Sequence, residues 1–150
     1  MRVVVRSSVM ERTIAYLRSQ AARNNEGVVY WGCKRRAETL SIETCSIPRT
    51  YLEIGPYQAV VGIEELCRCA DELIAAGCYL GARVHSHKRS ADHSPTDDGS
   101  PVTGELDFLS VVFADFARQA KPTMQAYQYL GAGDWYQWTD VDWQQRWTII

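Results

Sequence analysis

The sequence predicts a mixed α+β (α/β) fold, in which a central mixed β-sheet is flanked by helices. Short runs rich in β-branched and aromatic residues are interspersed with segments whose apolar residues recur at helical spacing. With 46% apolar and 23% charged residues, the composition is typical of a soluble globular protein. The 150 residues are long enough to bury a core and contain no internal repeat, so we expect one domain over 1–150.

The first third of the chain predicts a strand, a helix and a hairpin. Residues 2–6 contain three consecutive valines and predict a short strand. Ser8 can cap a helix whose apolar residues recur over 10–21, and which should end near residues 24–25. The continuous apolar run 27–33 predicts a central strand, and the loosely alternating run 37–47 predicts the second arm of a hairpin.

The middle of the chain predicts a loop, a helix and a buried strand. Pro48, Gly55 and Pro56 mark 49–57 as a loop. An apolar stripe over 63–76 predicts a second helix, which Gly77 closes. The run 78–84 has the length and composition of a buried strand.

The last third predicts another strand and a hairpin. After an irregular loop that reaches residue 107, residues 108–113 predict a strand. A hairpin is expected between 123–130 and 135–138, about a turn that contains two glycines. The residues that follow, with tryptophans at 143 and 147, predict a short helix or a packed tail.

Charge and cysteine content exclude several classes of protein. A net charge of −2 gives no electrostatic footprint for nucleic acid. No apolar run approaches the length of a membrane span and no signal-peptide pattern is present, so we expect a cytoplasmic protein without a membrane partner. The five cysteines are scattered, which favours reduced and mostly buried thiols. Cys67 and Cys69 lie in a helical pattern and point to different faces, so we expect packing rather than metal binding.

All three histidines lie within residues 85–93, directly after the buried strand 78–84. If His85 and His87 end that strand, the period of two places both imidazoles on one face. Two adjacent aspartates, Asp97 and Asp98, follow in the next loop. Two imidazoles and one carboxylate form a three-ligand set for catalytic Zn²⁺, with the fourth position left to water.

Residues of this stretch, together with Glu26, resemble a known sequence pattern. Glu26, the run His85-Ser86-His87 and the run Ser94-Pro95-Thr96-Asp97 resemble the JAMM signature of JAB/MPN-domain metalloproteases. The resemblance covers most of the chain, since 26–32 is similar to the family's first motif and 109–113 is similar to the strand after its metal loop. It implies a JAB/MPN-like central mixed sheet flanked by helices.

The chain departs from the family pattern in two places. Six residues separate His87 from Ser94, where many members have seven. We prefer the register with Ser94 and Asp97, because it keeps both the serine and its three-residue step to the aspartate; bacterial relatives often have this shorter form. Asp98 is the alternative ligand if the register shifts by one. Lys88 stands where a proline is usual.

The resemblance implies a role for each motif residue. His85, His87 and Asp97 would hold Zn²⁺, which makes water a nucleophile near neutral pH. Glu26 would act as general base and carry the proton to the leaving amine. Ser94 would donate a hydrogen bond to the oxyanion of the tetrahedral intermediate.

Two further polar residues of the stretch, Ser86 and His93, receive other interpretations. Ser86 should point to the opposite face of the strand from the two histidines, where it packs or supports the ligands. His93 is interpreted as a loop residue or as a support for the ligands rather than as a metal ligand.

The resemblance also implies a substrate class. JAMM enzymes commonly cleave the isopeptide bond between the C-terminus of ubiquitin, or a ubiquitin-like protein, and a lysine amine. Small bacterial members occur beside ubiquitin-like, E1-like and E2-like proteins in systems of defence against phage. The expected partner is therefore a ubiquitin-like protein, for deconjugation or precursor maturation, and the oligomeric state is left open.

Other classes of function remain open. One is a non-catalytic MPN scaffold, although such members typically lose the ligands. Another is a JAMM peptidase that acts on a different substrate, such as a sulfur-carrier protein. A nucleobase deaminase is disfavoured, since its His-x-Glu and Pro-Cys-x-x-Cys elements are absent.

Overall fold

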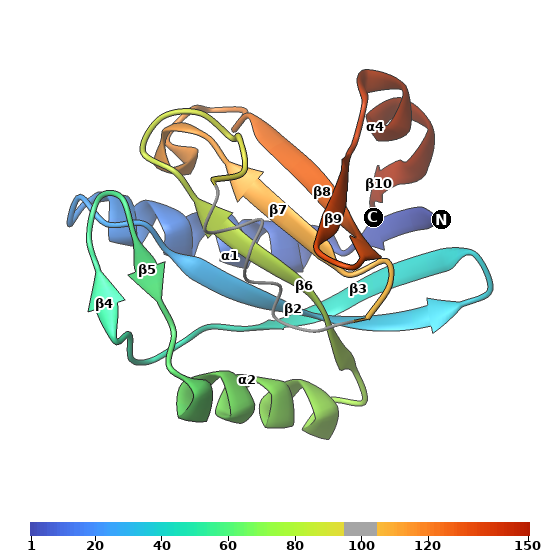
Figure 1. Cartoon of the computed structure of the whole chain (residues 1–150), viewed down its shortest axis with the longest axis horizontal. Coiled ribbons are helices and arrows are strands. Elements are labelled where there is room, and N and C mark those ends of the chain that lie inside the picture. The colour runs from blue at the N-terminus through green and yellow to red at the C-terminus, as the bar shows by residue number, and fades with distance from the viewer. Residues whose placement is uncertain (95–104) are drawn as a thin grey trace.

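A computed structural model describes residues 1–94 and 105–150 of the chain (Figure 1). The strands of the main sheet are β1 (Arg2–Val5), β2 (Val28–Arg36), β3 (Thr39–Ser46), β6 (Tyr79–Ser86), β7 (Leu109–Phe113), β8 (Met124–Gly131), β9 (Asp134–Gln137) and β10 (Trp147–Ile149). A separate two-stranded sheet consists of β4 (Glu53–Ile54) and β5 (Ala59–Val60). The helices are α1 (Ser7–Ala21), α2 (Ile63–Ala75) and α4 (Asp140–Arg146), and η1 (Asp115–Ala117) is a short turn.

The main sheet is mixed, with the strand order β10-β1-β3-β2-β6-β7-β8-β9 (Figure 1). Near its middle, β6 pairs antiparallel with β2 and parallel with β7. At one edge β10 pairs parallel with β1, which brings the two ends of the chain side by side. A mixed sheet combined with helices confirms the predicted α+β class.

The larger core lies on the α1 face of the sheet. Residues Val28 to Cys33 of β2 are all buried, and alternate side chains point to opposite faces. Val29 and Trp31 join Leu17 of α1 in this core. The Trp31 indole donates a hydrogen bond to the Thr13 hydroxyl across 2.9 Å, so the one polar atom of the ring has a partner.

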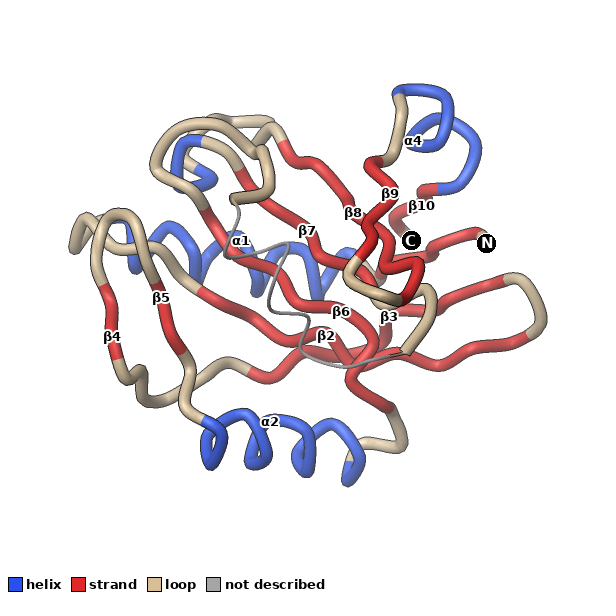
Figure 2. The backbone as a smooth tube through the Cα atoms, in the orientation of Figure 1, coloured by secondary structure: helices blue, strands red, loops and turns tan. Residues whose placement is uncertain are grey.

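A smaller core lies on the α2 face. Val28 and Tyr30 pack there against Cys69 and Leu73 of α2. In Figure 2 α2 runs along one side of the main sheet, and the β4–β5 hairpin lies at the left, separate from that sheet. His85 is directly opposite Val28 in the β2–β6 pair, so it belongs to this same face.

Several predicted boundaries change. Helix α1 begins at Ser7 with Arg6 in the N-cap position and no side-chain cap, so the expected cap at Ser8 is wrong. The main chain supplies the reason, because the Ser7 N–H donates to the Ile150 carbonyl across 2.7 Å. The expected loop 49–57 contains the short strand β4, and the tail contains α4 followed by β10.

Four cysteines behave as packing residues, but the packing expected of Cys67 is wrong, because it points to a different face of α2 from the buried Cys69 and is exposed. All except Cys67 are buried, and every cysteine is free. Burial raises the pKa of the Cys33 thiol, which keeps it protonated and unreactive. Across residues 1–94 and 105–150, no helix combines the length and the apolar composition that a membrane crossing requires.

Candidate metal centre

Strand β6 brings two histidines together at its C-terminal end. His85 lies within the strand and is 2% exposed, whereas His87 directly follows it and is half-buried. The Nε2 atoms of the two rings are 3.1 Å apart, with ring centroids separated by 4.8 Å. The period of two therefore places both imidazoles on one face, as the sequence predicts.

The spacing of the two rings and the hydrogen bond of His87 Nδ1 suit a metal ion. Two nitrogen ligands of a tetrahedral Zn²⁺ lie about 3.3 Å apart when each Zn–N bond is about 2.0 Å. The observed 3.1 Å between the Nε2 atoms of His85 and His87 is close to that distance. His87 Nδ1 is 3.1 Å from the Ser90 carbonyl oxygen. With the proton on Nδ1 donated to that carbonyl, the lone pair of Nε2 is available for a metal.

The turn after β7 holds the segment that contains His87. The His87 N–H donates to the Phe113 carbonyl, and the His87 carbonyl accepts from the Phe116 N–H, each across 2.8 Å. The Arg89 carbonyl accepts from the Asp115 N–H across 2.8 Å. Asp115 and Phe116 have φ values of 49° and 52°, a left-handed conformation that is unfavourable for side chains other than glycine. The hydrogen bonds that both residues donate, together with the burial of Phe116, maintain this strain at a candidate functional site.

Glu26 lies beside the histidine pair through the pairing of β2 with β6. The Gly27 N–H donates to Ser86 Oγ across 2.9 Å, and the Ser86 N–H donates to the Gly27 carbonyl across 3.1 Å. Glu26 directly precedes Gly27, and its side chain borders the same hollow as His87. The Glu26 side chain is buried, at 8% exposure. Ser86 is fully buried, which agrees with the predicted packing role.

A groove of ≈ 890 Å³ opens beside these residues. On the side of the sheet its lining includes Glu26, Tyr30, Arg83, His87 and Ser94; on the other side it includes Glu53, residues 57–61, Ile63 and Leu66. One wall is therefore the β4–β5 hairpin with the start of α2, and the other contains the predicted catalytic residues. An extended polypeptide could lie along such a groove.

The predicted carboxylate ligand cannot be placed. Asp97 and the alternative Asp98 lie outside the described residues, so the choice between them stays a prediction. Ser94 is described, is half-buried and lines the groove. The His93 ring stacks on Tyr127, with centroids 3.8 Å apart, and its Nε2 atom is 2.8 Å from Ser110 Oγ.

Sequence reasoning missed other residues of the groove. Arg83 lines the groove and precedes His85 by two, so the strand period could have identified it. Lys88 Nζ lies 5.6 Å from the centroid of the Tyr57 ring, a cation–π contact between the two walls. No sequence signal joins Lys88 to Tyr57, because only the tertiary fold brings the two walls together.

Comparisons with known proteins agree with the fold and with part of the proposed chemistry. No protein-family model matches the chain. The chain is 34% identical over 107 residues to the probable metalloprotease y4jG of Sinorhizobium fredii (strain NBRC 101917 / NGR234). That match covers 70% of this chain and 66% of the relative, just under two thirds of its length.

A solved structure shares the fold. The solution structure of protein DSY2949 from Desulfitobacterium hafniense is similar with a TM-score of 0.70, over 99% of this chain and 91% of that one. At 16% sequence identity, the likeness concerns the fold alone. By sequence, then, this chain is a relative of a probable metalloprotease, and by architecture it shares the α+β fold of DSY2949.

Proposed function

We propose that the chain is a JAMM-type zinc peptidase in which His85, His87 and Asp97 hold the metal ion. One observation carries the proposal: two imidazole Nε2 atoms converge at 3.1 Å at the end of β6, whose antiparallel partner β2 begins two residues after the buried Glu26. The similarity to a probable metalloprotease supports a metal-dependent peptidase. A scaffold without catalytic function would have no need of this constellation.

The chain's own residues divide the work of peptide hydrolysis. When bound by two neutral imidazoles and a carboxylate, Zn²⁺ would supply Lewis acidity for the hydrolysis near neutral pH. Glu26 takes the proton from the attacking water and delivers it to the leaving amine. Ser94 donates a hydrogen bond to the oxyanion, an interaction that contributes roughly 2.7–4 kcal/mol in comparable sites.

For the substrate, we propose the C-terminal tail of a ubiquitin-like protein. A flexible tail could extend along the groove, where Val60, Ile63 and Leu66 offer an apolar wall. The two-residue strands β4 and β5 leave main-chain groups that an added strand could pair with. Deconjugation or precursor maturation in a bacterial cytoplasmic system with E1-like and E2-like partners, directed against phage, is the setting that the family resemblance suggests.

Zinc content and cleavage, measured on the same preparations, test the assignment. Wild type should bind one zinc per chain and cleave a ubiquitin-like protein that has a C-terminal fusion. Glu26→Gln should keep the zinc and lose at least roughly 100-fold in kcat, the usual effect of removing a general base. Asp97→Ala should lose the zinc. The matched controls are Glu11→Gln and Asp71→Ala, two exposed carboxylates outside the proposed machinery, and both should behave as wild type.

Each other outcome has a definite meaning. Loss of zinc in Asp98→Ala instead of Asp97→Ala would move the ligand by one residue. One zinc per chain without cleavage of ubiquitin-like fusions would contradict the substrate and favour another peptide, such as a sulfur-carrier precursor. Folded wild type that binds no zinc would contradict the enzyme and leave the scaffold.

A further inference from the structure

We infer that His93 is a positioning residue, which fixes the main chain next to Ser94 by fastening it to strands β7 and β8. This inference rests on the proposed function, because it concerns the serine that would donate to the oxyanion. We call the group Ala91, His93, Ser110 and Tyr127 the His93 anchor. Neither the family resemblance nor the strand period assigns a role to Ser110 or Tyr127.

The hydrogen bonds of the anchor hold two main-chain groups at once. The His93 N–H donates to the Tyr127 hydroxyl oxygen across 3.0 Å. The same hydroxyl donates its proton to the Ala91 carbonyl across 3.1 Å. A single phenol therefore fixes both ends of the tripeptide that precedes Ser94. The His93 side chain adds a third connection, from Nε2 to Ser110 Oγ at 2.8 Å.

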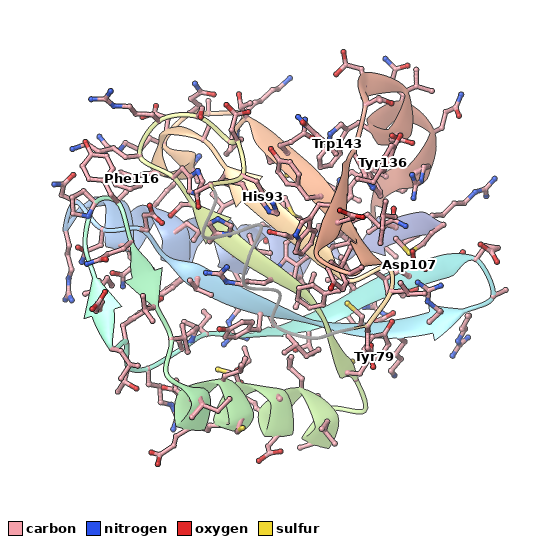
Figure 3. All side chains as sticks on the ribbon, in the orientation of Figure 1. Tyr79, His93, Asp107, Phe116, Tyr136 and Trp143 are labelled. Atoms are coloured by element: carbon pink, nitrogen blue, oxygen red, sulfur yellow. The ribbon has the colours of Figure 1, made fainter. Side chains whose placement is uncertain are left out.

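Ring contacts orient the imidazole as well. The His93 ring is nearly parallel to that of Tyr127, at 14° and with centroids 3.8 Å apart. Trp135 contacts the His93 ring edge-on, at a centroid distance of 5.0 Å and 82°. Tyr127 and Ser110 are 5% and 4% exposed, so the anchor is attached to the buried part of the sheet. Figure 3 shows His93 near the middle of the molecule, over the sheet.

The anchor and the histidine pair come from adjacent strands of the same sheet, with the histidines at the end of β6 and the anchor residues Ser110 and Tyr127 on β7 and β8. In the β6–β7 register Val112 is opposite His85, and Ser110 lies two residues earlier on β7. The segment after β6 is thus held at His87 and Arg89 by the turn after β7, and at its far end by the anchor. Ser94 follows directly and lines the groove with His87. Its distance from the imidazoles is therefore set before any substrate binds, which is the preorganisation that oxyanion stabilisation requires.

Histidine combines two properties that other residues supply singly. Phenylalanine at position 93 could stack on Tyr127 but could not bond Ser110. Glutamine could bond Ser110 but offers no ring to stack. The contributions can therefore be separated by substitution: His93→Phe removes the bond to Ser110, and Tyr127→Phe keeps the stacked ring and removes both hydroxyl bonds.

The experiment compares Tyr127→Phe and His93→Phe with wild type. The matched control is Tyr136→Phe, which removes the hydroxyl that donates to Asp142 across 2.7 Å, toward the C-terminal helix (Figure 3). The first readout is the rate of tryptic cleavage after the exposed Arg89, relative to cleavage after Arg36, the exposed last residue of β2. The second is kcat and KM for the fusion substrate of the proposed function.

A variant that breaks the His93 anchor should show both faster proteolysis and a lower kcat. In Tyr127→Phe we expect cleavage after Arg89 to rise about tenfold and kcat to fall about tenfold. A tenfold change corresponds to the free energy that one buried hydrogen bond typically contributes. KM should stay unchanged, because substrate contacts remain. His93→Phe should show a smaller change of the same kind, and Tyr136→Phe should behave as wild type.

Three outcomes would overturn the inference. One is a rate of proteolysis after Arg89 that is the same in both variants as in wild type. Another is faster proteolysis with unchanged kcat, since the anchor would then not act on the site. A change confined to KM would assign these residues to substrate binding instead. If wild type cleaves no ubiquitin-like fusion, the proposed function fails, and the tryptic rates still decide whether His93 and Tyr127 fix the segment.

Discussion

Ser86 shows how a small side chain supports the candidate site from inside the sheet. It lies between the two histidines, and its hydroxyl accepts a hydrogen bond from the Gly27 N–H, next to the proposed general base Glu26. The period of a strand predicts that Ser86 faces away from the imidazoles, and it is fully buried. The exact partner could not be predicted, because it depends on the register between β2 and β6.

At the same scale, Gly81 is required for the close packing of β6 on β2. A Cβ atom at this position would lie 2.5 Å from Cys33 Sγ and 2.7 Å from Cys33 Cβ. We expect Gly81→Ala to lower the free energy of unfolding by about 1–3 kcal/mol, the usual effect of overpacking a core. Cys33→Ala in the same chain should recover part of that loss, as measured by urea denaturation.

Gly55→Ala is the control for this prediction, because nothing lies within 4 Å of a Cβ placed there. It should have little effect on unfolding. If Gly81→Ala lowered the free energy of unfolding equally in the wild-type chain and in the Cys33→Ala chain, the strain would have a source other than Cys33.

At the scale of elements, sequence reasoning succeeded where the hydrophobic pattern is long. The strand of the histidines and the helix α2 each span eight or more residues and were predicted. The strands β4 and β5 have two residues each, too few for any period to show. The predicted loop 49–57, which Gly and Pro mark, contains β4, and β5 follows that loop, so the sequence predicts neither strand where the structure has one wall of the groove.

The start of α2 fastens that wall, and the contact should depend on pH. The Glu65 carboxylate accepts from the Arg49 and Thr50 N–H groups, across 2.8 and 3.0 Å, and pairs with Arg68. The pKa of Glu65 is lowered from an ordinary 4.5 to about 2, and the hydrogen bond from Arg68 is the largest cause. A depressed pKa in the folded state stabilises the protein above the ordinary value, and the stabilisation is lost as pH falls through the folded value.

Glu65→Gln should therefore lower Tm at neutral pH, and its difference from wild type should shrink below pH 4.5, towards pH 2. Thermal unfolding across this range measures the effect. Glu64→Gln, an exposed carboxylate in the same turn, is the control and should follow wild type throughout. A Tm difference that stays constant with pH would contradict the role assigned to the Glu65 charge.

At the scale of the whole molecule, stability and the site belong to different faces of the sheet. The larger core packs on α1, whereas the groove lies on the face covered by α2. Leu17 and Leu73 offer a matched comparison, since both are leucines on helices and both are almost fully buried. Truncating either should lower the free energy of unfolding by about 2–5 kcal/mol.

Their effects on the proposed activity should differ. Leu73→Ala should raise KM for the fusion substrate, because α2 supplies Ile63 and Leu66 to the groove. Leu17→Ala should leave KM unchanged at a temperature well below its Tm. Urea denaturation and steady-state kinetics on the same preparations measure both quantities. An equal rise of KM in both variants would show that the two faces are coupled.

The order of elements was predictable from the sequence, but the order of strands in the sheet was not. Hydrophobic period reports which face of a segment is buried, and it carries no information about its neighbours. The parallel pairings of β1 with β3 and with β10 join segments far apart in the chain. The same limit applies to the site: the histidine spacing predicts that two imidazoles meet, whereas Ser110 and Tyr127 arrive from strands that are paired only in the folded protein.

The parallel pairing of β6 with β7 has a consequence for synthesis on the ribosome. The histidines are translated before the strand and the turn that hold them, and the His93 anchor requires Tyr127, still later in the chain. A nascent or prematurely terminated chain that ends before β8 therefore lacks the contacts that assemble the site. Because proteins emerge from their N-terminal end, a peptidase built in this way would stay inactive until β8 has been made.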